Sequence, residues 1–456
     1  MNNVADFKRI FCLFFWISSC ISGDILSNPL INRVLESLGK TSGGATIIKN
    51  EENTGVNRDF CALGEESSHR HRFVYYVTGR GFGHATRTIE VCKHLLEAGH
   101  EVCICSTVPE YVFKRELPRL HFRHCEMDTS VIQHDALTVA REGSLEHYFK
   151  RIHRNREEIL EREARFLEEC DPDCVVVDAA PLACVAGKLA GKPVACVTNF
   201  RWDHVYQGLL DSLSPEEELS DNYQDMIDQI VEDYHMVDEW LKLPSHHPMP
   251  EVEEGGVRKG PKVCEVPLVV RRPHRGRHQA RKEINLPPDY HHLAILSVGD
   301  HDHPEAWNLK DEYLPDGWRC LVIGLNDRQV KLGSKFHMVC RDAYIPDLMM
   351  AADVIVGKLG YSTMAELLCC KRPCVYFSRE HWLEERYLID LLNKNGVVIP
   401  MPSEDFIEGK WASYLEEAIE MNAISEREYR ECCDGGKVVA GILEQMAETR
   451  KIHKNK

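Results

Sequence analysis

The sequence predicts an α/β protein with two domains of similar size, each a doubly wound parallel sheet with helices on both faces. Two observations predict this fold class. Short runs of β-branched residues alternate with helical patterns along most of the chain. These runs are apolar at every position rather than at alternate positions, which is typical of strands buried on both faces. The 456 residues suffice for more than one domain, at ~100–200 residues each.

The first set of elements begins near residue 72. Phe73 to Val77 is a β-branched and aromatic run, a glycine-rich turn follows it, and a helical pattern covers Ala85 to Ala98. Glu101 to Cys105 supplies the next strand, which completes the strand–loop–helix–strand unit of a parallel sheet. The alternation continues with a charged helix over 144–168, a strand at Cys174–Val177, a helix at Leu182–Ala190, a strand at Val194–Val197 and an acidic helical segment over 215–240.

Helix- and strand-breaking residues separate the two sets of elements. Proline or glycine occupies seven positions between Pro244 and Pro261, which predicts a linker. The second set comprises strands at Pro267–Val270, Leu293–Val298, Arg319–Ile323, Asp353–Val356 and Cys374–Phe377, and a closing helix from Gly435 to Ile452. The predicted organisation is a leader and poorly ordered tail over 1–70, a first domain over 71–245, the linker over 246–262 and a second domain over 263–456.

Composition and charge exclude two classes of protein. The 72 Asp and Glu residues against 55 Lys and Arg give a formal charge of −17, and such a surface repels nucleic-acid phosphates. No apolar run reaches the ~20 residues of a membrane-spanning helix. We therefore expect no nucleic-acid partner and no polytopic membrane insertion.

The amino-terminal residues and the cysteines point to different compartments. Residues 1–23 have the pattern of a secretory leader, with Lys8 and Arg9 before an apolar stretch. The nineteen cysteines are an odd number, and many lie inside apolar runs where they behave as small buried hydrophobic residues. We expect a cytoplasmic protein, with the secretory pathway as the alternative if residues 1–23 act as a signal peptide.

The glycine-rich loop after the first strand, of sequence GRGFGHATR from residue 79, is a candidate ligand-binding turn. Gly81 and Gly83 allow close approach of a ligand to the backbone, and the following helix offers free N–H groups. The spacing does not match the dinucleotide-binding fingerprint. His84, at the helix start, is the candidate general base. The alternative is that His84 caps or packs the helix.

A second candidate loop, GKLGYSTMAE, follows the strand that ends at Val356. Gly357 and Gly360 open the loop, and Ser362 and Thr363 begin a helix whose amino terminus can hold a diphosphate. Glu366 lies one turn further on, where its carboxylate can accept both hydroxyls of a ribose. The alternative is a capping box between Thr363 and Glu366, which would fold this carboxylate back onto its own helix start.

Together these motifs resemble those of the GT-B glycosyltransferases, among them the bacterial peptidoglycan N-acetylglucosaminyltransferases. From Tyr75 to about Ile442 the chain more closely resembles the amino-terminal half of the plant L-arabinokinases, through the segments YYVTGRGFGHATR, VTNFRWD, VPLVVRR, DAYIPD and GKLGYSTMAE. The phosphate loop of the kinase half, P-x-x-x-G-L-S-S-S, does not occur, so the resemblance does not imply sugar kinase activity. It implies two Rossmann-like domains that face a central cleft.

The resemblance also assigns roles in binding a nucleotide-sugar donor. His84 matches the histidine that closes the family's first glycine loop. Arg271 or Arg272 matches an arginine that faces the donor diphosphate, although both could belong to a solvated basic turn. Tyr344 and Ile345 match the segment whose backbone reads the nucleobase, and Glu366 matches the ribose-binding acid.

Two positions depart from the family pattern. Glu384 and Glu385 stand where the family presents two glutamines to the donor sugar, so the sugar identity is open. Gly299 begins the turn after strand Leu293–Val298, where the family has two glycines and this chain continues as Asp300-His301-Asp302-His303. We expect an exposed polar loop here rather than a metal site, and we expect no bound metal or cofactor, because GT-B enzymes meet the diphosphate charge with a helix dipole and basic side chains.

The predicted function is therefore transfer of a sugar from a nucleoside-diphosphate donor, such as a UDP-sugar, to a hydroxyl acceptor. The partners are that donor and a sugar, lipid or small-molecule acceptor. Asp178 and Asn199, which follow strands of the first domain, are candidate acceptor-binding residues, with helix capping as the alternative. The alternative functions are a non-catalytic nucleotide- or sugar-binding module and a nucleotide-sugar 2-epimerase.

Overall fold

The computed structural model describes residues 60, 70–79, 82–133, 138–214, 222–249, 261–284, 286–287, 289–298, 307–325, 330–340, 343–379, 381–424 and 433–454. All of them belong to one compact unit that runs from Gly55 to Lys456. The predicted leader, Gly81, Gly299 and the loop over 300–303 lie outside the described residues.

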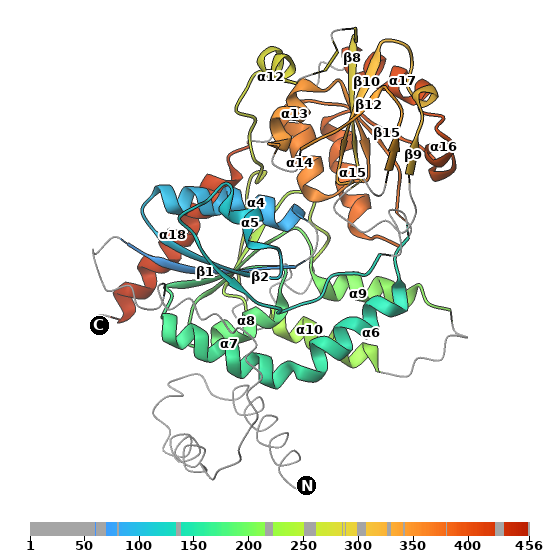
Figure 1. The fold of residues 1–456 in the computed structure, drawn as a ribbon. Helices are drawn as coiled ribbons and strands as arrows, with labels where there is room; N and C mark the ends of the chain where they lie inside the picture. The colour runs from blue at the N-terminus through green and yellow to red at the C-terminus, as the bar shows by residue number, and fades with distance from the viewer. Residues whose placement is uncertain are drawn as a thin grey trace, which may run out of the picture. The chain divides into compact units, whose positions relative to one another are not determined.

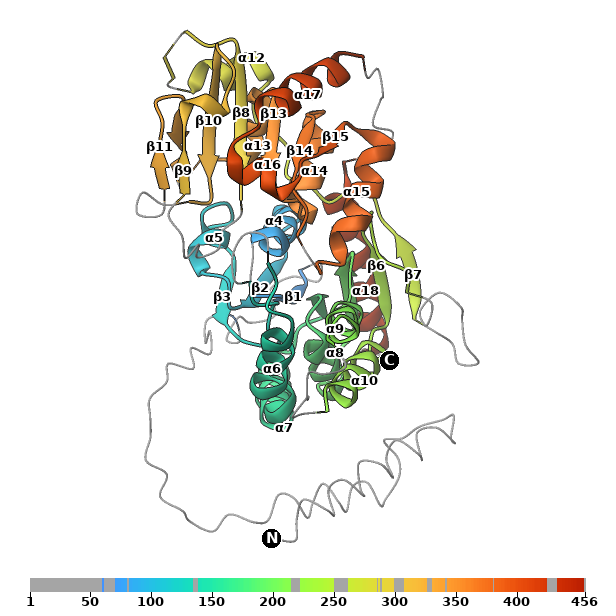
Figure 2. The same cartoon turned by 90° about the vertical axis from the view of Figure 1, so that its right-hand side faces the viewer.

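A seven-stranded parallel sheet carries the first half of the chain (Figures 1 and 2). Its strand order is β3-β2-β1-β4-β5-β6-β7. The strands are β1 (Arg72–Val77), β2 (Glu101–Ser106), β3 (His121–His124), β4 (Cys174–Asp178), β5 (Val194–Thr198), β6 (Glu239–Lys242) and β7 (Lys262–Glu265). We call this sheet and the helices packed on it the first lobe.

Helices cover both faces of the first sheet, as the apolar strands predict. In Figure 1, α4 (Phe82–Glu97), α5 (Glu110–Lys114) and α18 (Gly435–Lys454) lie on one side, and α7, α8 and α10 lie on the other. Alternate residues of β1 belong to different cores: Phe73 and Tyr75 pack with α4, whereas Val74 and Tyr76 pack with the opposite helices. The remaining helices of this lobe are α6 (Arg141–Arg151), η2 (His153–Asn155), α7 (Arg156–Cys170), α8 (Pro181–Leu189), α9 (Trp202–Asp211) and α10 (Tyr223–Tyr234).

A six-stranded parallel sheet carries the second half, in the order β12-β10-β8-β13-β14-β15. We call it and its helices the second lobe. Its strands are β8 (His292–Ser297), β10 (Trp318–Ile323), β12 (Phe336–Met338), β13 (Val354–Gly357), β14 (Cys374–Tyr376) and β15 (Val398–Pro400), and β9 (Trp307–Leu309) pairs with β11 (Val330–Leu332) beside it. Its helices are α12 (Arg277–Glu283), η3 (Asp311–Tyr313), α13 (Ile345–Ala351), α14 (Tyr361–Cys370), α15 (Glu384–Asn395), α16 (Ser403–Glu408) and α17 (Ala412–Ile424).

Two predicted elements are wrong. Pro267–Val270 is not a strand: this segment is buried between the lobes, and its backbone groups bond to other partners. The Val269 amide donates to the Tyr361 hydroxyl at 3.3 Å, and the Leu268 carbonyl accepts from the Gly435 amide at 3.1 Å. The helix expected over 144–168 is instead two helices, α6 and α7, separated by the short 3-10 helix at His153–Asn155.

The chain returns to the first lobe at its last described helix. Helix α18 packs against α4, and its Glu444 Oε1 lies 3.1 Å from the Nε2 atom of His100, just before β2 (Figure 1). Strand β7, at Lys262–Glu265, also belongs to the first sheet. The domain limits that the sequence suggests stay a prediction. The packing of α18 on α4 and the pairing of β7 with β6 both join later segments of the chain to the first lobe.

Candidate functional site

The candidate residues gather where strands of both sheets end. His84 lies near the start of α4, which follows β1, while Asp178 is the last residue of β4 and Asn199 follows β5. Because β1, β4 and β5 are parallel neighbours, their carboxyl ends meet at one edge of the first sheet. Ser362, from the loop and helix after β13 of the second sheet, contacts the same region.

Arg87 joins the three first-lobe candidates into one buried network. His84 Nδ1 lies 3.0 Å from Asp178 Oδ1. The Arg87 guanidinium donates to both oxygens of Asp178, with its Nε atom 2.7 Å from Oδ2, and it also donates to Asn199 Oδ1. Its Nη2 atom lies 2.8 Å from His84 Nδ1. Among these, the His84 side chain alone retains appreciable exposure, at 14%.

The ionised form of Asp178 is strongly favoured. Burial alone would raise the pKa of this carboxyl, but the charges and hydrogen bonds of Arg87 and His84 outweigh burial and lower the pKa to about 2. Neither Asp178 nor Asn199 caps the helix that follows it. The amino-terminal cap residues of α8 and α9 are Ala180 and Arg201, without side-chain cap bonds. The helix-capping alternative is therefore wrong at both positions.

The start of α14 lies against the start of α4. Ser362 Oγ lies 2.8 Å from the Gly83 carbonyl oxygen and can donate to it, and it lies 2.6 Å from Thr86 Oγ1. The α14 amino-terminal cap residue is Gly360 and makes no side-chain cap bond. Thr363 is half-buried in the first turn. The amino terminus of this ten-residue helix thus lies next to the residue that precedes His84.

Glu366 pairs with Arg271 instead of folding back onto its helix start. Arg271 is buried, and it donates from Nη2 to Glu366 Oε1 at 2.9 Å and from Nη1 to Glu116 Oε1, just after α5, at 2.8 Å. Burial raises the pKa of Glu366, and Arg271 opposes that rise. The capping-box alternative is therefore wrong. Of the two arginines that the sequence left open, Arg272 is half-exposed and pairs with Asp434, away from Glu366.

The two glutamates at the start of α15 are both buried and bonded. Glu384 Oε1 accepts from Asn199 Nδ2 at 2.9 Å, and its Oε2 accepts from Trp382 Nε1 at 3.2 Å. Glu385 accepts from the backbone amide of Arg379 at 3.0 Å and from its Nε atom at 3.3 Å. The contact between Asn199 and Glu384 links the predicted acceptor side to the predicted donor side.

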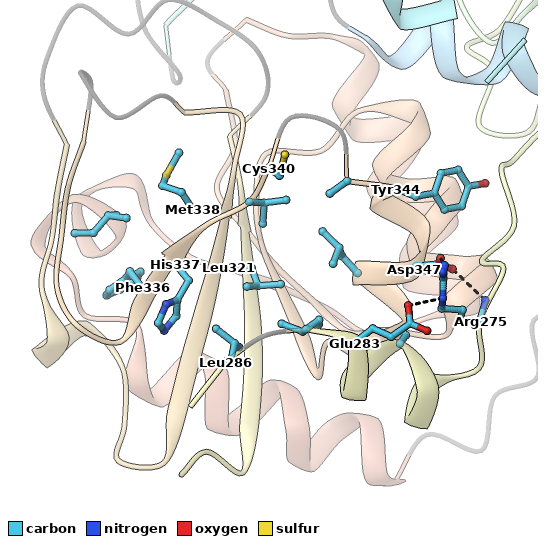
Figure 3. A pocket seen from close by; sticks show the side chains of 16 residues that line it. Arg275, Glu283, Leu286, Leu321, Phe336, His337, Met338, Cys340, Tyr344 and Asp347 are labelled. Carbon is cyan, nitrogen blue, oxygen red and sulfur yellow. Dashed lines mark hydrogen bonds and ion pairs between the residues drawn. The ribbon is translucent and has the colours of Figure 1, made fainter. Parts of the chain in front are cut away.

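Tyr344 borders a cavity of about 740 Å³ in the second lobe (Figure 3), and Ile345 follows it as the first residue of α13. Tyr344 immediately precedes α13, its ring stacks on His274 at 4.2 Å, and its hydroxyl donates to the Arg272 carbonyl at 3.0 Å. The cavity lies between strands β10 and β12 on one side and α12 and α13 on the other. Its lining is mainly apolar, and Arg275, Glu283 and Asp347 form an ion-paired rim in Figure 3.

Sequence analysis missed two residues of this region. Arg87 gave no signal, because its partners lie 91 and 112 positions away in the chain. Asp128 lies behind the first glycine loop, where it accepts from the hydroxyl of Thr78 and, at 3.0 Å, from Trp202 Nε1. Burial raises the pKa of Asp128 to about 7, against the effect of these hydrogen bonds. Arg87 ends the GRGFGHATR segment without a role that the sequence assigns to it, and Asp128 stands in none of the motifs.

Gly357, at the end of β13, has a structural reason to be glycine. A Cβ atom at this position would lie 2.0 Å from the Ser297 carbonyl oxygen of neighbouring strand β8. Gly360, by contrast, has nothing within 4 Å of such an atom.

The described residues include no candidate membrane span and no candidate metal cluster. None of their helices combines the length and the apolar character that crossing a bilayer requires. The same residues contain no group of three or more His, Cys, Asp or Glu side chains placed to hold a metal ion. The histidines at 301 and 303 lie outside this part.

Comparison with known proteins confirms the resemblance seen in the sequence. No protein-family model matches the chain. It is 38% identical over 408 residues to a protein named L-arabinokinase from Arabidopsis thaliana; the match spans 89% of this chain but only 36% of the relative. CalG4, the calicheamicin glycosyltransferase, superposes with a TM-score of 0.52 at 16% identity, covering 82% of this chain and 98% of that one.

A second solved structure, the glycosyltransferase of kitacinnamycin, superposes on this chain equally well. Its TM-score is also 0.52, at 15% identity over 83% of this chain and 99% of that one. At such identities the likeness concerns the fold. With its two parallel sheets and the helices on their faces, this chain has the GT-B fold that the sequence predicts, and it is similar along most of its length to about a third of L-arabinokinase.

Proposed function

We propose that this protein is a glycosyltransferase that moves a sugar from a nucleoside-diphosphate donor to a hydroxyl acceptor. One observation carries the proposal: a partly exposed histidine, bonded to a buried carboxylate, lies beside the amino terminus of a helix from the other lobe. Ser362 of that helix contacts the residue that precedes His84. A base and an anion-binding helix terminus next to each other are what transfer from a diphosphate requires.

In the proposed step, the acceptor hydroxyl displaces the nucleoside diphosphate from the anomeric carbon of the sugar. His84 removes the proton of the acceptor hydroxyl as its oxygen attacks the anomeric carbon. The bond between that carbon and the diphosphate oxygen breaks, and the nucleoside diphosphate leaves with the electron pair. The positive end of the α14 dipole would stabilise the leaving group. The Arg271 guanidinium, which the resemblance places on the diphosphate, is held here between Glu366 and Glu116.

The donor site we propose lies mainly in the second lobe. The segment at Tyr344 and Ile345 would meet the nucleobase, beside the cavity of Figure 3, and Glu366 would hold the ribose. Arg271 donates to Oε1 of Glu366, whose side chain is 4% exposed, so a ribose hydroxyl would have to reach Oε2 inside the protein. Gly81, Gly83, Gly299, Gly357, Gly360, Ser362, Thr363 and Arg272 remain in the proposal as flanking donor contacts.

The bonds of the two glutamates favour a second candidate, a binding module without transferase activity. The family resemblance places Glu384 and Glu385 on the donor sugar. In this structure both carboxylates already accept hydrogen bonds from other residues of the same chain. A site whose sugar-facing carboxylates are already satisfied would recognise a nucleotide more readily than a sugar. The relative is named as a kinase, and it is almost three times as long as the segment that this chain matches.

Calorimetric titration of the full chain with UDP, GDP and their sugars tests both candidates. The tightest-binding nucleotide sugar would then be incubated with candidate acceptors, and the products analysed by mass spectrometry. Binding followed by a glycosylated product and free nucleoside diphosphate supports the transferase. Binding without turnover supports the module, a C2-epimerised sugar would indicate the epimerase, and absence of nucleotide binding overturns the proposed site.

A further inference from the structure

We propose that Arg87 is a positioning residue that balances the charge of Asp178, so that His84 remains an uncharged imidazole able to accept a proton. A role of Arg87 in catalysis rests on the proposed function. Its effect on the protonation of His84 is independent of that function and can be measured without substrate.

Arg87 is buried, which is unusual for an arginine side chain. Its side chain is 3% exposed and Asp178 is fully buried. The guanidinium donates to both carboxylate oxygens and to Asn199, and its carbon lies 4.9 Å from the centre of the Tyr361 ring, which belongs to α14 of the other lobe. Five planar donors and a stacking face suit arginine and no other residue.

The two contacts of His84 Nδ1 have opposite consequences for the ring. A buried carboxylate 3.0 Å away stabilises a protonated ring, as any isolated buried anion would. The neutral ring that donates Nδ1–H to Asp178 keeps its lone pair on Nε2 and can accept a proton there. The Arg87 guanidinium, whose Nη2 atom lies 2.8 Å from Nδ1, places a positive charge beside that neutral ring and so disfavours the imidazolium. Because Arg87 and Asp178 together carry no net charge, the pair can orient the ring without holding it in the imidazolium form.

Other groups around the ring do not replace this balance. Phe200, after β5, meets the His84 ring edge-on at 5.2 Å and is apolar. Glu384 of α15 is bonded to Asn199 and Trp382, and Asp128 is bonded to Thr78 and Trp202. Tyr361 of α14 faces Arg87. Among the described residues that contact His84, Arg87 carries the positive charge that opposes Asp178.

Three variants separate charge from shape. Arg87→Met removes the guanidinium and leaves Asp178 paired with His84 alone. Arg87→Lys keeps the charge but loses the two-pronged contact. Arg87→Met combined with Asp178→Asn removes both charges, which also avoids leaving an uncompensated buried anion if the single variant unfolds. Circular dichroism and thermal unfolding establish that each variant is folded.

The first measurement is NMR of protein labelled with ¹⁵N-histidine, with the His84 signals assigned by their loss in His84→Gln. In Arg87→Met we expect the imidazolium form to persist to a pH ~1–3 units higher than in the unsubstituted protein. Arg87→Lys should shift this titration by much less, and the double variant should return it towards the original position. Equal titration of His84 in all four proteins overturns the inference.

The second measurement applies if transferase activity is found. The acidic limb of the pH–rate profile should move to higher pH in Arg87→Met, while the Kd for the nucleoside diphosphate stays within about twofold. A fall in kcat that is the same at every pH would assign Arg87 a purely structural role and contradict the proposal. Failure to find any transfer would remove the proposed function, yet the NMR titration would still decide the role of Arg87.

Discussion

The amide group of Asn199 bonds to both lobes at once: its Nδ2 donates to Glu384 Oε1 at 2.9 Å, and its Oδ1 accepts from Arg87. Glu384 begins α15 of the second lobe, 185 positions further along the chain. Since the oxygen faces a donor and the nitrogen faces an acceptor, the orientation of this side chain is fixed. The hydrogen-bond network of the candidate base therefore extends without a break from β5 of the first lobe to α15 of the second.

Replacing His84 by Gln should abolish most turnover. Loss of a general base lowers the rate by ~10²–10⁴-fold. The Kd for the nucleoside diphosphate, measured by calorimetry, should change by less than about twofold, because the proposed diphosphate contacts come from α14. His235→Gln, an exposed histidine after α10, is the matched control. Unchanged turnover in the His84 variant would rule it out as the base.

Replacing Glu366 by Gln should weaken nucleotide binding. A hydrogen bond to a charged group contributes ~1.5–3 kcal/mol, so we expect a loss of ~10–150-fold in affinity for UDP or GDP, whichever binds. The corresponding deoxynucleotides lacking ribose hydroxyls should bind the variant and the original protein alike. The control is Glu408→Gln, at an exposed position on α16. Equal losses with ribose and deoxyribose ligands would contradict a ribose contact.

Replacing Arg271 by Met should destabilise the fold. It would leave Glu366 and Glu116 without their shared cation, and breaking a buried ion pair on one side costs ~3–5 kcal/mol. Arg272→Met, in an exposed pair with Asp434, should cost ~1 kcal/mol or less. Urea unfolding measures both. If Glu366→Gln added to Arg271→Met restores no stability, the pairing is not the cause.

Replacing Gly357 by Ala should destabilise the second sheet, because the new Cβ atom would collide with the Ser297 carbonyl of the adjacent strand. We expect a loss of ~1–3 kcal/mol, as for other overpacked sites. Gly360→Ala is the matched control, since nothing lies within 4 Å of its Cβ position. Thermal unfolding of the two variants should show a much lower Tm for the first; similar values would contradict the close approach of β13 and β8.

Asp128 should make stability depend on pH between about 4 and 7. Its folded-state pKa is raised to about 7, above the ~3.9 of an unfolded chain, so the folded protein binds the extra proton in this range. Its contribution to stability is therefore present at low pH and is lost as the pH rises towards 7. The Tm difference between the original protein and Asp128→Asn should decrease across this range; a constant difference would contradict the raised pKa.

The alternation of apolar runs and helical patterns was sufficient to predict the buried central strands. It placed β1, β4, β5, β8 and β13 because these are apolar on both faces. It missed β7, Lys262–Glu265, which has a charged residue at each end and is largely exposed at the sheet edge, where the pattern of a doubly covered strand does not apply. It wrongly included Pro267–Val270, because burial between lobes produces the same apolar run as burial within a sheet.

The site was predictable one residue at a time but not as a network. Asp178 ends a strand and His84 and Asn199 follow strands, and a parallel sheet brings such positions together. Nothing in the sequence indicates that Arg87 joins these residues, or that Glu366 pairs with Arg271 instead of its own helix start. Which partner a side chain bonds to depends on distances in the folded protein, and the spacing of residues along the chain does not give those distances. The roles of these residues in donor and acceptor binding stay predictions.

The position of α18 has a practical consequence for dividing the molecule. This helix follows the second lobe in the chain, yet it covers α4, and its Arg450 and Lys451 bond to Asp171 and to the Arg70 carbonyl of the first lobe. A fragment cut near residue 262 would expose the apolar side of α4 to water and lose these anchors. To study the amino-terminal half in isolation, residues 433–454 should be fused back onto it. A tag at the carboxyl terminus should be tested for its effect on the first lobe, because α18 packs there.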